Sequence, residues 1–282
     1  MEDSLKDSAK NQIELLLGLL NSKLENCKER FKSEIFSSKF DSEINTIVNV
    51  YIIRSLTNIS RYALFLVTNV SRKQDESQFY LSQLRTLTEI VVKLIYILSL
   101  EVTDSARILI CEDLVAMHKI ADENFSDYIA HTLSSYEKLM IELDYLPRTF
   151  EDFSKNGLKK IQKTRRISLF YPDFNNLISE DFIKRNTPLL QKYMTGNLRE
   201  IFEYNWKSAS EHVHGNHFFN HASGNEIFWI DLSIFVLLGT VLEIVDRQVL
   251  GNERSADLRI RFKESMPIGA QLKEGWLLKL RR

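Results

Sequence analysis

The chain has 282 residues, of which 44% are hydrophobic and 11% aromatic, enough for a packed core in one large domain or two small ones. Its formal net charge is −1, which excludes a strong overall field drawing it to nucleic acid or to anionic membranes. Only nine glycines and four prolines interrupt it, so long helices are favoured over many short strands. Cys27 and Cys111 lie far apart and outside any Cys-x-x-Cys pair, and the first residues are unlike a signal peptide. We therefore expect a cytoplasmic protein without a disulfide framework.

The N-terminal half predicts a succession of long helices. Residues 5–31 carry apolar side chains at helical spacing, with charged side chains on the other face. Residues 43–71 contain no proline or glycine and predict one helix of about eight turns. A third, mostly buried helix is expected over 79–101. The breaker-free stretch 103–146 predicts a very long helix or two helices joined by a kink.

The C-terminal half is less regular. Helical spacing returns over 189–215, and a strongly apolar helix is expected over 226–250, ending at Gly251. Its run 227–245 is nearly as long as a membrane span but contains Asp231 and Glu243, so we interpret it as a central core helix. Residues 252–282 are basic, and "LRIRFKE" within them alternates as a short strand would.

These elements predict an all-α fold, an antiparallel bundle of about six or seven long helices. Each long helix can bury one stripe only against its neighbours, which favours a bundle. The bundle domain is expected to cover residues 1–250, with an irregular insert at about 147–187, and residues 251–282 form a short basic C-terminal tail or small appendage.

Residues 204–224 hold four of the six histidines and the first polar constellation. Tyr204, Ser208 and His212 follow one another at steps of four, so they share one face of a helix. Lys207 lies five residues before His212. Either these polar groups satisfy one another in a bundle helix, or they form an acid–base site. Histidine transfers protons near neutral pH, and a nearby lysine stabilises charge on a phosphate oxygen.

The second constellation is Arg85 and Glu89, one turn apart on an otherwise apolar helix. Burying such charges is costly unless they pair. They therefore form an internal ion pair that fixes helix register, or they support Tyr204 or His212 from a neighbouring helix.

Together the two constellations resemble an uncharacterised bacterial family of helical proteins. Its pattern is Arg-xxx-Glu on an apolar helix, here "RTLTE", followed near the C-terminal end by Tyr-xxx-Ser-xxx-His-x-x-Gly, here within "YNWKSASEHVHG". This pattern is in turn similar to the HEPN superfamily of small helical bundles, and the resemblance extends over residues 43–250. It implies a metal-independent ribonuclease of bacterial toxin–antitoxin, CRISPR or phage-defence systems, without a cofactor.

The HEPN motif is an arginine followed a few residues later by a histidine. Lys207 stands where that arginine is expected, and it offers a point charge rather than a bidentate fork. The resemblance implies that His212 acts as general acid or base and that Lys207 stabilises phosphate charge. It further implies that Tyr204 and Ser208 orient the phosphate or the imidazole, and that two motif helices meet across a homodimer interface.

Two other stretches are candidates for binding a metal ion or RNA. His212, His214, His217 and His221 are an alternative metal-ligand set, but the first two point to different helix faces and Gly215 is placed to end that helix. We therefore predict no metal site and interpret them as a histidine-rich helix end. The stretch 154–166 carries six basic residues and no acid, and is either a solvated face or an RNA contact. The predicted RNA contacts are Lys159, Lys160, Lys163, Arg165 and Arg166.

The leading hypothesis is a HEPN-like, metal-independent endoribonuclease or toxin-like effector in bacterial phage defence. RNA and a second copy of the chain are its expected partners, and no membrane is involved. The alternative is a non-catalytic helical interaction module within a defence or regulatory complex, which docks to a protein partner through the apolar helix or the basic tail.

Overall fold

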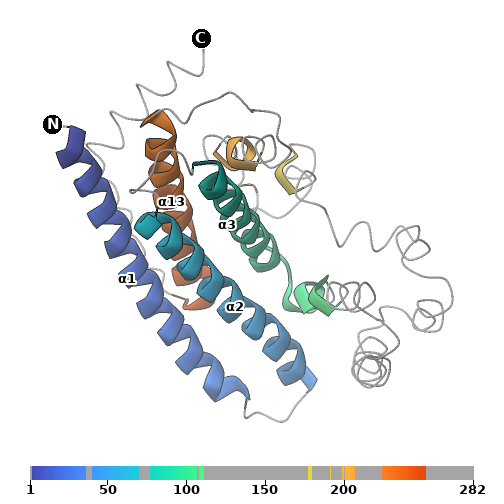
Figure 1. The fold of residues 1–282 in the computed structure, drawn as a ribbon. Helices are drawn as coiled ribbons and strands as arrows, with labels where there is room; N and C mark the ends of the chain where they lie inside the picture. Colours follow the sequence, from blue (N-terminus) through green and yellow to red (C-terminus); the bar gives the residue numbers. More distant parts are fainter. Residues whose placement is uncertain are drawn as a thin grey trace, which may run out of the picture. The chain divides into compact units, whose positions relative to one another are not determined.

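The computed structural model of the protein describes residues 2–35, 40–69, 77–106, 108–110, 177–179, 191, 199, 201–206 and 224–251. Four long helices account for most of them and are labelled in Figure 1: α1 (Glu2–Ile35), α2 (Phe40–Asn69), α3 (Ser77–Leu98) and α13 (Gly224–Ile244). Residues 102–106, 108–110 and 201–206 are also helical. The described part contains no strand, so the fold is the all-α bundle predicted from sequence.

Three predicted features lie outside the described residues. They are the greater part of helix 103–146, most of the insert at 147–187, and the basic tail with its alternating "LRIRFKE" stretch. The four long helices, by contrast, begin and end within a few residues of the expected 5–31, 43–71, 79–101 and 226–250.

The chain divides into two compact units. The first consists of Met1–Cys27, Ile59–Leu87 and Ser208–Arg282, and the second of Lys28–Asn58 and Thr88–Lys207. Helices α1, α2 and α3 each contribute residues to both units. Each unit is therefore assembled from segments that are distant in sequence.

In the first unit, α2 contacts both of its neighbours in the chain. The Ser60 hydroxyl of α2 donates a 2.7 Å hydrogen bond to the Asn21 side-chain oxygen of α1. The Tyr80 hydroxyl of α3 donates to the carbonyl of Asn69, the last residue of α2, at 3.2 Å. The rings of Phe65 and Tyr80 lie 6.4 Å apart and tilted by 45°, a favourable aromatic geometry. Figure 1 shows α2 running in the direction opposite to α1 and to α3.

Helix α13 runs parallel to α1, from which it is separated by most of the sequence. Lys10 of α1 lies close enough to Asp231 of α13 to act on its charge, and Lys23 forms an ion pair with Asp246 just beyond the end of α13. Residue numbers therefore rise together along the two helices. Figure 1 shows α13, in orange, alongside α1, in blue.

The apolar stripe predicted for α1 is its buried face. Positions three and four apart face the same side of a helix, and the residues at that spacing are at most 7% exposed. They are Ile13, Leu16, Leu17, Leu20 and Leu24. The opposite face is open, and Leu15 is 70% exposed.

Helix α13 is a central core helix, as its all-round apolarity predicts. From residue 230 to its end it has no exposed position, and the most deeply buried side chains include Ile230, Ile234, Leu237, Leu238 and Val241. None of the described helices combines the length and the apolarity needed to cross a membrane. The two acids within this run, Asp231 and Glu243, are half-buried.

A single π-helical turn, Val245–Val249, follows α13. The Leu250 amide donates to the Val245 carbonyl at 2.9 Å, five residues back, which is the π pattern. Asp246 lies in this turn and is 3% exposed, although it pairs with Lys23. The helix stops at Gly251 as predicted, and its φ of 67° is in the left-handed region that glycine adopts without strain.

In the second unit, two serines hold the C-terminal end of α3. The last carbonyls of a helix lack partners within it and must find others. The Ser99 hydroxyl donates to the Tyr96 carbonyl, and the Ser105 hydroxyl donates to the Ile97 carbonyl, both at 2.7 Å. Ser105 is buried, so its hydrogen bond ties the short helix 102–106 to the end of α3.

Candidate functional site

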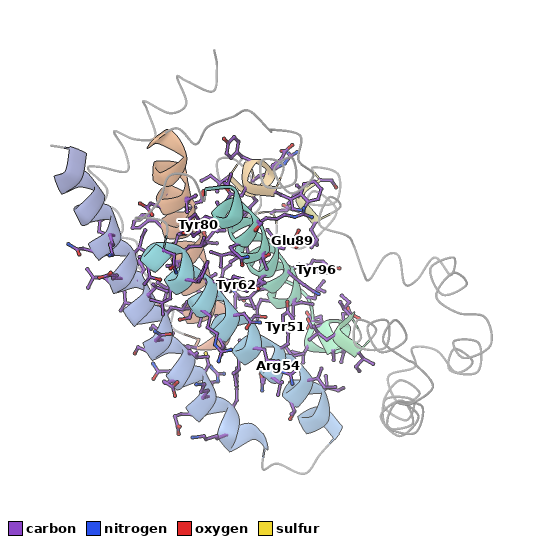
Figure 2. The ribbon with its side chains drawn as sticks, in the orientation of Figure 1. Tyr51, Arg54, Tyr62, Tyr80, Glu89 and Tyr96 are labelled. Carbon is purple, nitrogen blue, oxygen red and sulfur yellow. The ribbon has the colours of Figure 1, made fainter. Side chains whose placement is uncertain are left out.

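Charged side chains follow one line along α3. Arg85, Glu89 and Lys93 are spaced four residues apart, which places them on one face of the helix. All three are half-buried, whereas the neighbouring apolar residues of the same helix are fully buried. These are Leu84, Leu87, Val91 and Val92. The helix therefore carries a polar edge beside an apolar face, and Glu89 on this edge is labelled in Figure 2.

Within the second unit, the helical segment 201–206 contacts α3 through two polar side chains. Phe202 and Asn205 are completely buried. The Asn205 side-chain amide donates to the Thr88 hydroxyl at 3.3 Å, and the Trp206 ring nitrogen donates to Glu89 Oε1 at 2.9 Å. A hydrogen bond to a charged acceptor contributes about 1.5–3 kcal/mol, so the Trp206 contact is the stronger of the two.

Of the sequence-predicted site residues, Arg85, Glu89 and Tyr204 are described. Glu89 meets the segment that carries Tyr204 through the ring nitrogen of Trp206. Tyr204 is 39% exposed, while Phe202 and Asn205 on the same segment are buried. The other proposed catalytic residues, Lys207, Ser208 and His212, lie outside the described residues, as do His214, His217, His221, Lys159, Lys160, Lys163, Arg165 and Arg166.

Sequence reasoning missed Thr88, Asn205 and Trp206. Thr88 precedes Glu89 directly, and Asn205 lies three residues after Phe202, so it falls on the apolar side of its segment. A polar residue at a predicted core position needs a partner, and this was the available signal. The partner lies 117 residues away, which helical spacing cannot identify.

Tyr96, also labelled in Figure 2, has a perturbed acidity. Burial raises its pKa from 10.0 to about 12, and the nearby negative charge of Asp104 adds to the rise. Its hydroxyl therefore stays protonated near neutral pH.

Asp231 in the first unit is a described carboxyl group whose pKa is raised by burial. Burial raises its pKa from 3.8 to about 6, and the positive charge of Lys10 opposes the rise. A carboxyl group in this range changes its proton occupancy close to physiological pH, which is a property of acid–base sites and of buried structural carboxyl groups alike.

Replacing Asp231 with asparagine should make stability less dependent on pH. Between pH 3.8 and about 6 the folded state binds more protons at this site than the unfolded state, so the free energy of unfolding falls as pH rises. A shift of about two units corresponds to about 3 kcal/mol. Because the unfolded-state carboxyl is already more than half ionised at pH 4, Asp231→Asn should gain about 2.5 kcal/mol over the parent between pH 4 and pH 8, measured by urea unfolding at both pH values.

Glu14→Gln is the matched control, because Glu14 is an exposed carboxylate on α1. It should change the free energy of unfolding by less than about 0.5 kcal/mol at either pH. An Asp231→Asn variant whose stability difference from the parent is the same at pH 4 and pH 8 contradicts the assigned titration.

The described residues contain no group of three or more His, Cys, Asp or Glu side chains arranged to hold a metal ion. Comparison of the chain with models of protein families, with curated proteins and with solved structures found no match in any of the three.

Proposed function

We propose that the protein is a HEPN-like ribonuclease that cleaves RNA without a metal ion, as a toxin-like effector in bacterial phage defence. One observation carries the proposal. The Trp206–Glu89 hydrogen bond joins the two stretches that resemble the HEPN-like pattern, "RTLTE" on α3 and the segment that begins "YNWKSASEHVHG". They are more than 100 residues apart in sequence, and a shared site requires them to be close.

The proposed chemistry is general acid–base catalysis on the RNA backbone. His212 removes the 2′-hydroxyl proton, the 2′-oxygen attacks the phosphorus, and the bond to the 5′-oxygen breaks. The leaving 5′-oxygen takes its proton from water, and the phosphate remains as a 2′,3′-cyclic ester. In the alternative assignment water takes the 2′-hydroxyl proton and a protonated His212 gives its proton to the leaving oxygen. Lys207 stabilises the phosphate charge, Tyr204 and Ser208 orient the phosphate, and Glu89 and Arg85 support that face. The 39% exposure of Tyr204 suits contact with a ligand that arrives from solvent.

RNA contacts beyond the site are assigned to the basic stretch 154–166, through Lys159, Lys160, Lys163, Arg165 and Arg166. Such contacts neutralise phosphates and are weakened by salt. The active form is proposed to be a homodimer in the cytoplasm, which brings two motif helices together as the resemblance implies.

One observation favours the second candidate, a non-catalytic interaction module. Leu15 and Leu19 lie one turn apart on the open face of α1 and are 70% and 38% exposed. Gly18 beside them faces open space, since a methyl group added there meets no other atom. A glycine within a helix costs about 1 kcal/mol relative to alanine, and close approach by a partner helix is one reason for it.

The two candidates are separated by fractionating the purified protein by size with light scattering and testing each fraction on RNA. We expect cleavage that persists in EDTA and that coincides with a species of twice the 33.0 kDa chain mass. Cleavage abolished by EDTA contradicts metal independence, and a single 33 kDa species with activity contradicts the dimer. Absence of cleavage on both structured and unstructured transcripts favours the interaction module.

A further inference from the structure

Segment 201–206 is held by apolar burial and by two hydrogen bonds to α3. Phe202 is fully buried, and because apolar burial is not directional, it does not by itself select the rotation of the segment or its level along α3. The hydrogen bonds from Asn205 to Thr88 and from Trp206 to Glu89 require particular atoms at 3.3 Å and 2.9 Å. The two donors, Asn205 and Trp206, are adjacent in the sequence, and so are the two acceptors on α3. The two bonds together therefore fix one rotation of the segment and one level along α3.

We propose that Asn205 and Trp206 are positioning residues that fix this setting for the ribonuclease proposed above, on which the inference rests. Trp206 is joined directly to Lys207 by a peptide bond, so its position defines where the proposed phosphate-binding cation begins. Misplacing a catalytic group by about 1 Å costs about 100-fold in rate. The loss of either hydrogen bond therefore lowers the rate of cleavage without removing a group that touches RNA.

The burial of Asn205 supports this role over simple packing. An apolar side chain at a fully buried position adds hydrophobic stabilisation, whereas an amide needs a hydrogen-bond partner there. Asn205 satisfies that need through Thr88, which is also completely buried. Fixing the register between helices is the best-attested role of buried polar groups of this kind.

The test compares the parent with Trp206→Phe, which keeps an aromatic ring but removes the donor, and with Thr88→Val, which keeps the shape but removes the hydroxyl. Ile97→Val is the matched control, a mild core substitution in the same unit, since Ile97 is 1% exposed. We expect kcat to fall by about 10- to 100-fold in Trp206→Phe and Thr88→Val with KM little changed, while Ile97→Val keeps the parent kcat. Glu89→Gln retains an acceptor oxygen and should lose less activity than Glu89→Ala.

The outcomes separate this inference from the function on which it rests. A parent that cleaves RNA while Trp206→Phe and Thr88→Val match Ile97→Val in kcat overturns the positioning role alone. A parent that does not cleave RNA overturns the ribonuclease and, with it, any positioning in cleavage. The hydrogen bond between Trp206 and Glu89 is tested without an activity assay. The shifts in urea midpoint caused by Trp206→Phe and Glu89→Ala should not add up in the double variant, and additive shifts overturn the contact.

Discussion

Replacing His212 with alanine is expected to lower RNA cleavage by about 10²- to 10⁴-fold, the usual contribution of a general acid or base. The reason is chemical, because among the proposed catalytic groups only an imidazole both accepts and donates a proton efficiently near neutral pH. Cleavage is measured as initial rate on a labelled transcript at saturating enzyme. Circular dichroism and a thermal unfolding curve establish that the variant is folded.

His118→Ala is the control for this experiment, since His118 is a histidine that precedes the "YNWKSASEHVHG" stretch by more than 80 residues in the sequence. It should cleave at the parent rate. If a folded His212→Ala variant also cleaves at the parent rate, His212 is not the acid–base group, and the resemblance to the HEPN motif loses its central residue.

Breaking the Lys23–Asp246 ion pair should cause a large loss in the free energy of unfolding of the protein. The Asp246 side chain is only 5% exposed and that of Lys23 21%. Lys23→Met keeps most of the apolar stem but leaves the carboxylate buried without its cation, which costs about 3 kcal/mol, the lower end of the range because Lys23 is partly exposed. The loss is measured as the free energy of urea unfolding at pH 7.

The double variant tests whether an uncompensated charge is the cause of the lost stability. Adding Asp246→Asn to Lys23→Met removes the uncompensated charge, so the double variant should be more stable than Lys23→Met alone. Lys32→Met is the matched control on the same helix, because Lys32 and Glu29 form an ion pair whose side chains are 66% and 70% exposed. It should change stability by less than about 1 kcal/mol. A double variant less stable than Lys23→Met argues against an uncompensated charge as the cause.

The helices of this fold are readable from sequence because each buries a stripe of regular spacing. Ile13, Leu16 and Leu20 identify the inner face of α1 without any knowledge of its partners. The apolarity of α13 on all sides similarly indicates its central place. These properties belong to one helix at a time, which is why local sequence is sufficient.

The contacts of the candidate site were not readable in the same way. Tyr204, Ser208 and His212 share a face by spacing, but spacing does not state which way that face points, and Tyr204 is exposed. Glu89 was expected to support Tyr204 or His212, and the spacing gave no sign that it also accepts a hydrogen bond from Trp206. The rotation of one helix against another depends on side chains far away in sequence, and a single sequence carries no direct record of such pairs.

The π-helical turn also has no sequence signal. "VDRQV" contains neither proline nor glycine, and an uninterrupted α-helix to Gly251 is what its composition predicts. The turn contains the partner of Lys23, so its geometry is tied to an ion pair with a helix near the other end of the chain.

The parallel arrangement of α1 and α13 has a consequence for synthesis of the protein on the ribosome. Lys23 and Asp246 are separated by more than 200 residues, which take roughly 10 to 45 s to translate at about 5–20 residues per second. During that interval α2 and α3 have been made, but α13, whose Asp231 lies near Lys10 of α1, does not yet exist. Contacts so distant in sequence slow folding, and Lys23 has no Asp246 to pair with until the segment that follows α13 has been synthesised.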